Sequence, residues 1–176
     1  GLARSLAAVN EIPLWQISHQ ENHLEAGLWS AQGPDADRFL LLHASGGTTD
    51  LLLAEKQTDS TYALTQAGGS KDLHAGQFVD RVGVALGLQF PAGAALEQLA
   101  ATAADCIELP VAVRQGDVSL SGPATAALRK IEAGADPAAL AAGVQYAMAE
   151  TFVRMIRNVA AQKEIFDVLL VGGVGS

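Results

Sequence analysis

The sequence predicts an α/β fold with a mixed β-sheet, and three observations support this class. Two apolar segments, 39–44 and 51–54, flank a short stretch rich in Ser, Gly and Thr, which is typical of a hairpin turn. Helical patterns dominate the second half of the chain, and the longest begins at Asp136-Pro137, a helix cap followed by proline. A late run of consecutive apolar residues over 167–171 is typical of a strand covered on both faces. Locally paired strands, then helices, then a buried strand indicate layers around one sheet.

Local signals predict the remaining elements. We expect a helix over 1–10, a short strand over 14–18 and a helix over 19–31. The second helix begins at a Ser18/Glu21 pair with the spacing of a capping box and stops at Gly33-Pro34. A third strand over 61–65 is expected to end at Gly68-Gly69. Between this strand and the last one we expect helices over 75–86 and 94–103, edge strands within 107–120, and helices over 123–133 and from 137 onward.

Composition limits the class of protein. A chain of 176 residues with 49% hydrophobic residues fits one domain of ordinary size. A net charge of −8 argues against nucleic-acid binding by this chain alone, because phosphate binding needs clustered Lys and Arg. Cys106 is the only cysteine, which excludes an internal disulfide and fits a reducing compartment such as the cytoplasm. No run of 18 apolar residues occurs, so we expect no membrane span.

His19 and His23 form the sharpest polar pair. Four residues apart on a helix, they share one face and can bind one metal ion through their imidazoles. Glu21 lies about 200° around the helix from His19 and so does not take the place of the general base in the H-E-x-x-H motif of zinc peptidases. The alternative is that both histidines are ordinary polar residues in the first turns of a helix.

Glycines and hydroxyl groups gather at two strand ends. The segment 45–49 holds two glycines and three hydroxyl residues, which suits either a phosphate cradle or a plain hairpin turn. Gly172-Gly173 follows the late buried strand, and ligands of α/β folds bind at the carboxyl ends of strands. From its position alone, Asp80 is expected to be a solvent-exposed acidic residue on a helix. His43 and His74 have no sequence spacing to a partner, so structural roles are expected for them.

Six blocks, taken in order, resemble the TsaD/Gcp family, the glycoprotease-like tRNA threonylcarbamoyladenosine biosynthesis transferases. The first resembles the H-x-E-G-H segment of that family, the second its V-S-G-G-H-T-Q-L hairpin, and the last its A-G-G-V turn. The blocks are Ile17–His23, Ala44–Leu51, Ala75–Arg81, Leu86–Gly93, Val118–Gly122 and Gly172–Val174. No block is decisive alone, but six in the same order along nearly the whole chain are specific.

The resemblance implies an actin/hexokinase-type (ASKHA) fold made of ribonuclease-H-like halves. Segment 1–34 would be a helix-strand-helix remnant of the first half, and 35–176 the second half, truncated at its C-terminus. Family members transfer a threonylcarbamoyl group from its adenylate to a tRNA adenosine. The implied cofactors are an adenine nucleotide or adenylate and a divalent metal, iron or zinc. The implied partners are an ASKHA partner subunit or a second copy of the chain, with tRNA bound only through the full-length protein.

The resemblance also carries residue roles, although it assigns no catalytic residue. His19 and His23 would be metal ligands. The nucleotide would be bound by His43, Ala44, Ser45, Gly46, Gly47, Asp80, Gly93, Gly172 and Gly173. Most of these lie at element ends, so we expect the 45–47 turn, Asp80, Gly93 and the 172–173 turn to face one cleft.

The chain departs from the family pattern at four positions. Asn22 replaces a Gly, Thr48 a His, Gln77 a Glu, and Ala124 a Lys. A third metal ligand of the family, an Asp, would lie beyond Ser176, so we expect at most two protein ligands here and no tightly bound ion in this chain alone. These departures keep a non-catalytic scaffold paralogue open as an alternative. A metallopeptidase is the least favoured interpretation, because Glu21 does not take the place of the general base in the zinc-peptidase motif.

Overall fold

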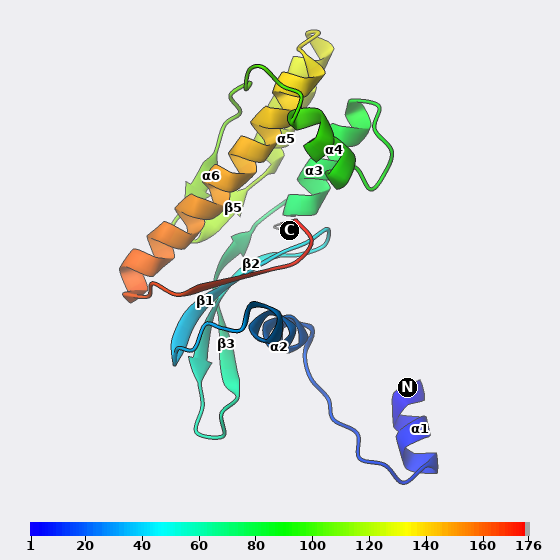
Figure 1. Cartoon of the computed structure of the whole chain (residues 1–176), viewed down its shortest axis with the longest axis vertical. Coiled ribbons are helices and arrows are strands. Elements are labelled where there is room, and N and C mark those ends of the chain that lie inside the picture. Colours follow the sequence, from blue (N-terminus) through cyan, green and yellow to red (C-terminus); the bar gives the residue numbers. More distant parts are fainter. Residues whose placement is uncertain (175–176) are drawn as a thin grey trace.

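The computed structural model describes residues 1–174 and contains a six-stranded mixed sheet with helices on both faces (Figure 1). In chain order the elements are α1 (Leu2–Val9), α2 (His19–Ala31), β1 (Arg38–Ala44), β2 (Thr49–Lys56), β3 (Tyr62–Ser70), α3 (Ala75–Ala85), α4 (Gly93–Ala100), β4 (Ala112–Arg114), β5 (Asp117–Ser119), α5 (Ser121–Glu132), α6 (Pro137–Lys163) and β6 (Val168–Val171). The strand order is β4-β5-β3-β2-β1-β6. The predicted α/β class with a mixed sheet is therefore confirmed.

The predicted hairpin lies inside this sheet, and the late strand β6 forms one of its edges. The prediction that this strand is covered on both faces is wrong, because Leu169 and Val171 are buried while Val168 and Leu170 on its other face are exposed. β1 and β2 pair antiparallel, with Leu42 opposite Leu51 and Ala44 opposite Thr49. β6 lies parallel to β1 on its other side, with Leu40 beside Val168. A parallel pair needs a long crossover, and the chain between β1 and β6 supplies it with all four later helices. This arrangement brings the turn after β1 and the turn after β6 to the same end of the sheet.

The two faces of the sheet have separate apolar cores, because successive strand residues point to opposite sides. Phe39 and Leu41 of β1 face α2 and pack with its Leu24. Leu40 and Leu42 face the layer of α3, α4, α5 and α6. In Figure 1, α2 lies on one side of the strands and these four helices lie on the other. His43 continues the series of Phe39 and Leu41, so its side chain belongs to the α2 face.

Two predicted strands differ from the structure. Residues 12–18 form no strand, and Leu14, Trp15 and Ile17 are exposed, because no neighbouring strand offers hydrogen bonds to this segment. β3 is longer than predicted and runs through Gly68 and Gly69. A Cβ at Gly68 would lie 2.1 Å from the carbonyl oxygen of Gly116, so glycine here allows a close approach between backbones and does not end the strand.

The helices follow the predictions closely. The capping box at the start of α2 is present: the Glu21 amide donates to Ser18 Oγ at 3.1 Å, and the Ser18 amide donates to Glu21 Oε2. α3 ends one residue earlier than expected, and α4 ends at Ala100. Among residues 1–174, no helix combines the length and the apolar character that a membrane span requires.

Asp72 fastens the segment between β5 and α5 to the end of β3. One carboxylate oxygen accepts from the Ser119 hydroxyl at 2.6 Å and the other accepts from the Leu120 amide at 2.9 Å. The Leu73 amide also donates to this carboxylate. Burial opposes ionisation of Asp72, but these hydrogen bonds outweigh it and hold the pKa of Asp72 well below its usual range.

Asp72→Asn is therefore expected to destabilise the fold by about 1 kcal/mol at neutral pH, a modest loss because water screens the exposed carboxylate. Since the pKa is lowered in the folded state, this stabilisation is complete above the unfolded aspartate pKa of about 3.9 and fades as the pH falls below it. Urea unfolding between about pH 7 and pH 3 checks this. The control is Asp105→Asn, at an exposed aspartate, and a pH-independent difference between wild type and Asp72→Asn would contradict the assignment.

Candidate functional site

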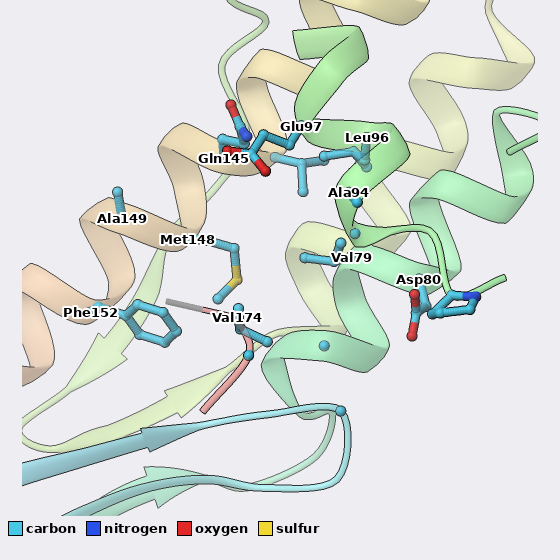
Figure 2. Close-up of a pocket in the computed structure, with 16 residues that line it drawn as sticks. Val79, Asp80, Ala94, Leu96, Glu97, Gln145, Met148, Ala149, Phe152 and Val174 are labelled. Carbon is cyan, nitrogen blue, oxygen red and sulfur yellow. The ribbon is translucent and has the colours of Figure 1, made fainter. Parts of the chain in front are cut away.

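A pocket opens between the helical layer and the end of the sheet (Figure 2). Its volume is about 620 Å³, which is sufficient for a nucleotide-sized ligand. α3, α4 and α6 supply its walls, and the turns after β1 and β6 supply its floor. The lining residues are Gly46, Gly76, Val79, Asp80, Pro91, Gly93, Ala94, Leu96, Glu97, Val144, Gln145, Met148, Ala149, Phe152, Gly173 and Val174.

Four positions singled out from the sequence meet in this pocket. Gly46, Asp80, Gly93 and Gly173 all line it, although they come from four separate parts of the chain. The other expected nucleotide contacts do not line it. Ala44 is buried in the core below, and Ser45, Gly47 and Gly172 lie at the edges of the two turns.

The hairpin turn is seated on the first turn of α3. The Gly76 amide donates to the Ser45 carbonyl at 3.1 Å, and the Ala75 amide donates to Thr49 Oγ1 at 2.8 Å. A Cβ at Gly76 would lie 2.5 Å from the Cα of Gly46, so the close contact between turn and helix depends on this glycine. The contact fixes the position of Gly46 at the pocket wall.

Asp80 connects α3 to the loop before α4. Its Oδ1 accepts a hydrogen bond from the Ala92 amide at 2.7 Å, which positions the adjacent Gly93. Its other oxygen accepts no hydrogen bond from the residues that the structure describes. Figure 2 shows the carboxylate at the edge of the pocket beside this loop. Asp80 is half-buried and is thus more than the solvated helix acid that its sequence position alone suggests.

The chemistry of the walls suits a nucleoside better than a cluster of phosphates. Met148 and Phe152 of α6 form an apolar wall, with Val79 and Leu96 nearby. The charged side chains on the lining are acidic, and none of the described lining residues is Lys, Arg or His. The sequence predicted the α6 stripe only as core. An amphipathic pattern does not distinguish a core face from a pocket wall, so no signal in the sequence could have found these residues.

A second polar cluster lies on the opposite face of the sheet, where His19 and His23 of α2 meet His43 of β1. The ring centroids are 4.5 Å apart for His19 and His23, 4.0 Å for His23 and His43, and 5.5 Å for His19 and His43. The structure thus brings His43 to the histidine pair and not to the pocket beside Gly46. The family resemblance implied a nucleotide contact for His43 and its spacing alone a structural role, whereas here its ring is buried beside two imidazoles and does not line the pocket. The reason is that strand alternation turns its side chain towards α2.

His43 is the buried member of this cluster. Its side chain has no solvent exposure, and neither ring nitrogen has a hydrogen-bond partner. Burial lowers the pKa of His43, nearby His23 and His19 lower it further, and Asp50 across the hairpin opposes them. The ligand atoms of the three imidazoles lie within 4.8 Å of one another, a donor set that suits a transition-metal ion. The residues present therefore fit a metal.

The position of Glu21 separates this cluster from a peptidase site. Its carboxylate accepts from the Ser18 amide in the capping box, and this hydrogen bond lowers the pKa of Glu21. A carboxylate engaged at the helix start does not serve as general base at the histidines. The geometry agrees with the sequence argument against a zinc-peptidase arrangement.

Comparison with known families decides the relationship. The model of TsaD, described as tRNA N6-adenosine threonylcarbamoyltransferase, matches residues 1–176. The chain belongs to the TsaD family. TsaD relatives described as tRNA N6-adenosine threonylcarbamoyltransferase include one from Methanopyrus kandleri, 35% identical over 99% of this chain, and one from Thermus thermophilus, 36% identical over 99% of it. The chain spans 49% and 53% of these two TsaD proteins.

A solved structure supports the fold expected of TsaD. The crystal structure of the Acidaminococcus fermentans (R)-2-hydroxyglutaryl-CoA dehydratase component A matches with a TM-score of 0.56 and 18% identity. The match covers 95% of this chain and 57% of that protein. At this identity the similarity concerns the fold alone. The chain has the actin/hexokinase-type α/β fold.

Proposed function

We propose that this chain is the part of a TsaD-type tRNA threonylcarbamoyltransferase that binds an adenine nucleotide or adenylate in the pocket of Figure 2. The observation that carries the proposal is the meeting of Gly46, Asp80, Gly93 and Gly173 at one pocket with an apolar wall. The intact protein would transfer the threonylcarbamoyl group to tRNA. Since this chain is acidic, tRNA would be held by the rest of the protein or by a partner of the same fold.

Each part of the ligand has a matching surface. The adenine base packs against the apolar wall at Met148 and Phe152. A ribose hydroxyl donates to the Asp80 oxygen that the Ala92 amide leaves available. Phosphate oxygens approach the backbone amides of the turn at Gly46, where glycine leaves room for them. Because none of the described lining residues is a cation, the phosphate depends on these backbone amides.

Calorimetric titration of the intact protein with AMP, and with a non-hydrolysable threonylcarbamoyl-adenylate analogue, tests the proposal. Asp80→Ala is expected to weaken binding by about 1.5–3 kcal/mol, the usual worth of a hydrogen bond to a charged group. Asp80→Asn keeps an oxygen that can accept from the Ala92 amide, so it separates loop anchoring from ribose binding. We expect Asp80→Asn to bind more weakly than wild type and more tightly than Asp80→Ala. Equal affinities for all three proteins would exclude Asp80 from the site.

The departures from the family pattern favour a second candidate, a scaffold subunit that binds nucleotide without transferring the group. The position where the family has a Lys is occupied by Ala124, which is fully buried in the core. No cation replaces it on the described pocket lining. An assay of tRNA threonylcarbamoylation by the intact protein separates the two candidates. Nucleotide binding without transfer, alone or with a partner subunit, identifies the scaffold.

A metal ion is the second implied cofactor. The family resemblance assigns it to His19 and His23, and in this chain those two imidazoles lie side by side on α2. Such an ion supplies Lewis-acid stabilisation of a negatively charged ligand. The protein contributes the start of α2, where the Ser18/Glu21 capping box fixes the first turn. Both histidines of this helix lie against His43 of the sheet.

A further inference from the structure

We propose that His43 is a third metal ligand in this protein, so that His19, His23 and His43 bind one divalent ion of the zinc or iron class. The family resemblance supplies only the first two histidines. His43 comes from the sheet, 20 residues after His23 in the sequence, and its own position in the chain carries no metal signature. With His43, this chain alone supplies three imidazole ligands to the ion.

The distances fit this assignment. The ligand nitrogens lie within 4.8 Å of one another. Around a tetrahedral zinc ion with bonds of about 2.0–2.1 Å, neighbouring nitrogens are roughly 3.3 Å apart. We expect side-chain rotation to close that difference. His19 is exposed and free to rotate, whereas buried His43 is fixed by the sheet.

The burial of His43 points to a ligand. Its side chain is fully buried, and both Nδ1 and Nε2 lack a hydrogen-bond partner in the structure. Buried polar groups are normally satisfied, because an unpaired group loses its hydration without compensation. The neighbours of this ring are two further imidazoles, and it forms no hydrogen bond with either of them. A metal ion satisfies one nitrogen of each ring at once.

The local fold holds α2 at the distance that this site needs. Gly27 lies one turn after His23 on the same helix face, and a Cβ there would lie 2.5 Å from Cγ1 of Val171. Val171 is the neighbour of His43 in the sheet. Glycine at position 27 therefore lets α2 approach β6 closely, which places His23 over His43. Val171 and Leu169 continue the contact along β6.

Three imidazoles leave room for a further ligand. Imidazole suits Zn²⁺, Fe²⁺, Co²⁺ and Ni²⁺, and three protein ligands are the usual number when a metal also binds water or substrate. The metal site and the nucleotide pocket share no residue, so variants can test the two proposals separately. Failure of one proposal would leave the other standing.

Titration of the metal-free intact protein with Co²⁺ tests the site, because cobalt bound by nitrogen ligands gives a visible absorption band that reports on coordination. Wild type is expected to bind one equivalent tightly. His43→Leu is expected to weaken Co²⁺ and Zn²⁺ binding by more than about 100-fold, beyond the 10–100-fold typical of groups that only orient a ligand. Leucine suits this position, since Leu40, Leu41 and Leu42 precede it in the same buried strand.

The matched control is His74→Leu, at the remaining histidine of the chain, which lies outside the cluster. This variant is expected to bind Co²⁺ like wild type. X-ray absorption of the zinc-loaded wild type counts imidazole ligands without any substitution and is expected to give three. Wild-type affinity in folded His43→Leu, or only two imidazoles in the absorption spectrum, would overturn the proposal.

Discussion

Replacing Gly46 with valine is expected to abolish measurable nucleotide binding while leaving the fold intact. Gly46 lines the pocket, yet a Cβ built on it would meet no atom within 4 Å, and its backbone is not left-handed. The fold therefore does not require glycine at this position, whereas a ligand that approaches the turn amides does. Losing one or two hydrogen bonds to a phosphate, each worth about 1.5–3 kcal/mol, weakens binding by at least about 10-fold and in the upper range beyond detection.

A matched substitution separates the pocket from general effects of valine. Gly122 of α5 also has open space around a built Cβ, and it does not line the pocket. Gly122→Val is expected to bind AMP like wild type in the same calorimetric titration. Circular dichroism and the unfolding temperature of both variants report on the fold. A Gly46→Val protein that folds normally and still binds AMP with wild-type affinity would remove the hairpin turn from the site.

The parts of the fold that the sequence predicted correctly are those with local signals. The hairpin of β1 and β2 follows from two apolar runs around a glycine turn, and α2 begins at a capping box whose two hydrogen bonds are present. The late strand was recognisable because it is apolar on consecutive positions, but those positions did not reveal that it is an edge strand with one exposed face. The segment 14–18 shows the limit of such signals. Its residues suit a strand, but strand formation depends on a partner elsewhere in the chain.

In the candidate sites, too, some residues were predictable from the sequence and others were not. Family resemblance brought Gly46, Asp80, Gly93 and Gly173 forward together, and they line one pocket. The apolar wall of α6 was not predicted, because the same periodic stripe serves both core and pocket.

The position of His43 beside the α2 histidines also escaped prediction. It depends on the register of β1 and on how closely α2 packs against β6. Both are tertiary properties that have no short sequence pattern.

Alanine is expected to destabilise the protein strongly at the first glycine after β6 and hardly at the second. Gly172 has a φ of +101°, and a Cβ there would lie 2.2 Å from the carbonyl oxygen of Ala44. Gly172→Ala therefore combines backbone strain with a clash against β1, and we expect a loss of about 2–4 kcal/mol in unfolding free energy. Gly173 has open space around a built Cβ and no left-handed φ, so Gly173→Ala is expected to change stability by less than about 1 kcal/mol.

The same pair distinguishes support of the site from contact with the ligand. Gly172 does not line the pocket of Figure 2, whereas Gly173 does. The backbone after Gly172 is tied to β1, because the Val174 amide donates to the Ala44 carbonyl at 3.2 Å, the same oxygen that a Cβ at Gly172 would strike. Gly172→Ala should therefore displace this turn and lower both stability and AMP affinity. Gly173→Ala should lower AMP affinity alone, because its methyl group would occupy space that the ligand needs.

Urea unfolding and calorimetry on the two variants measure the free energy of unfolding and the AMP affinity. A stable Gly172→Ala protein would show that the turn relaxes without strain, and unchanged AMP affinity in Gly173→Ala would place the ligand away from the end of β6.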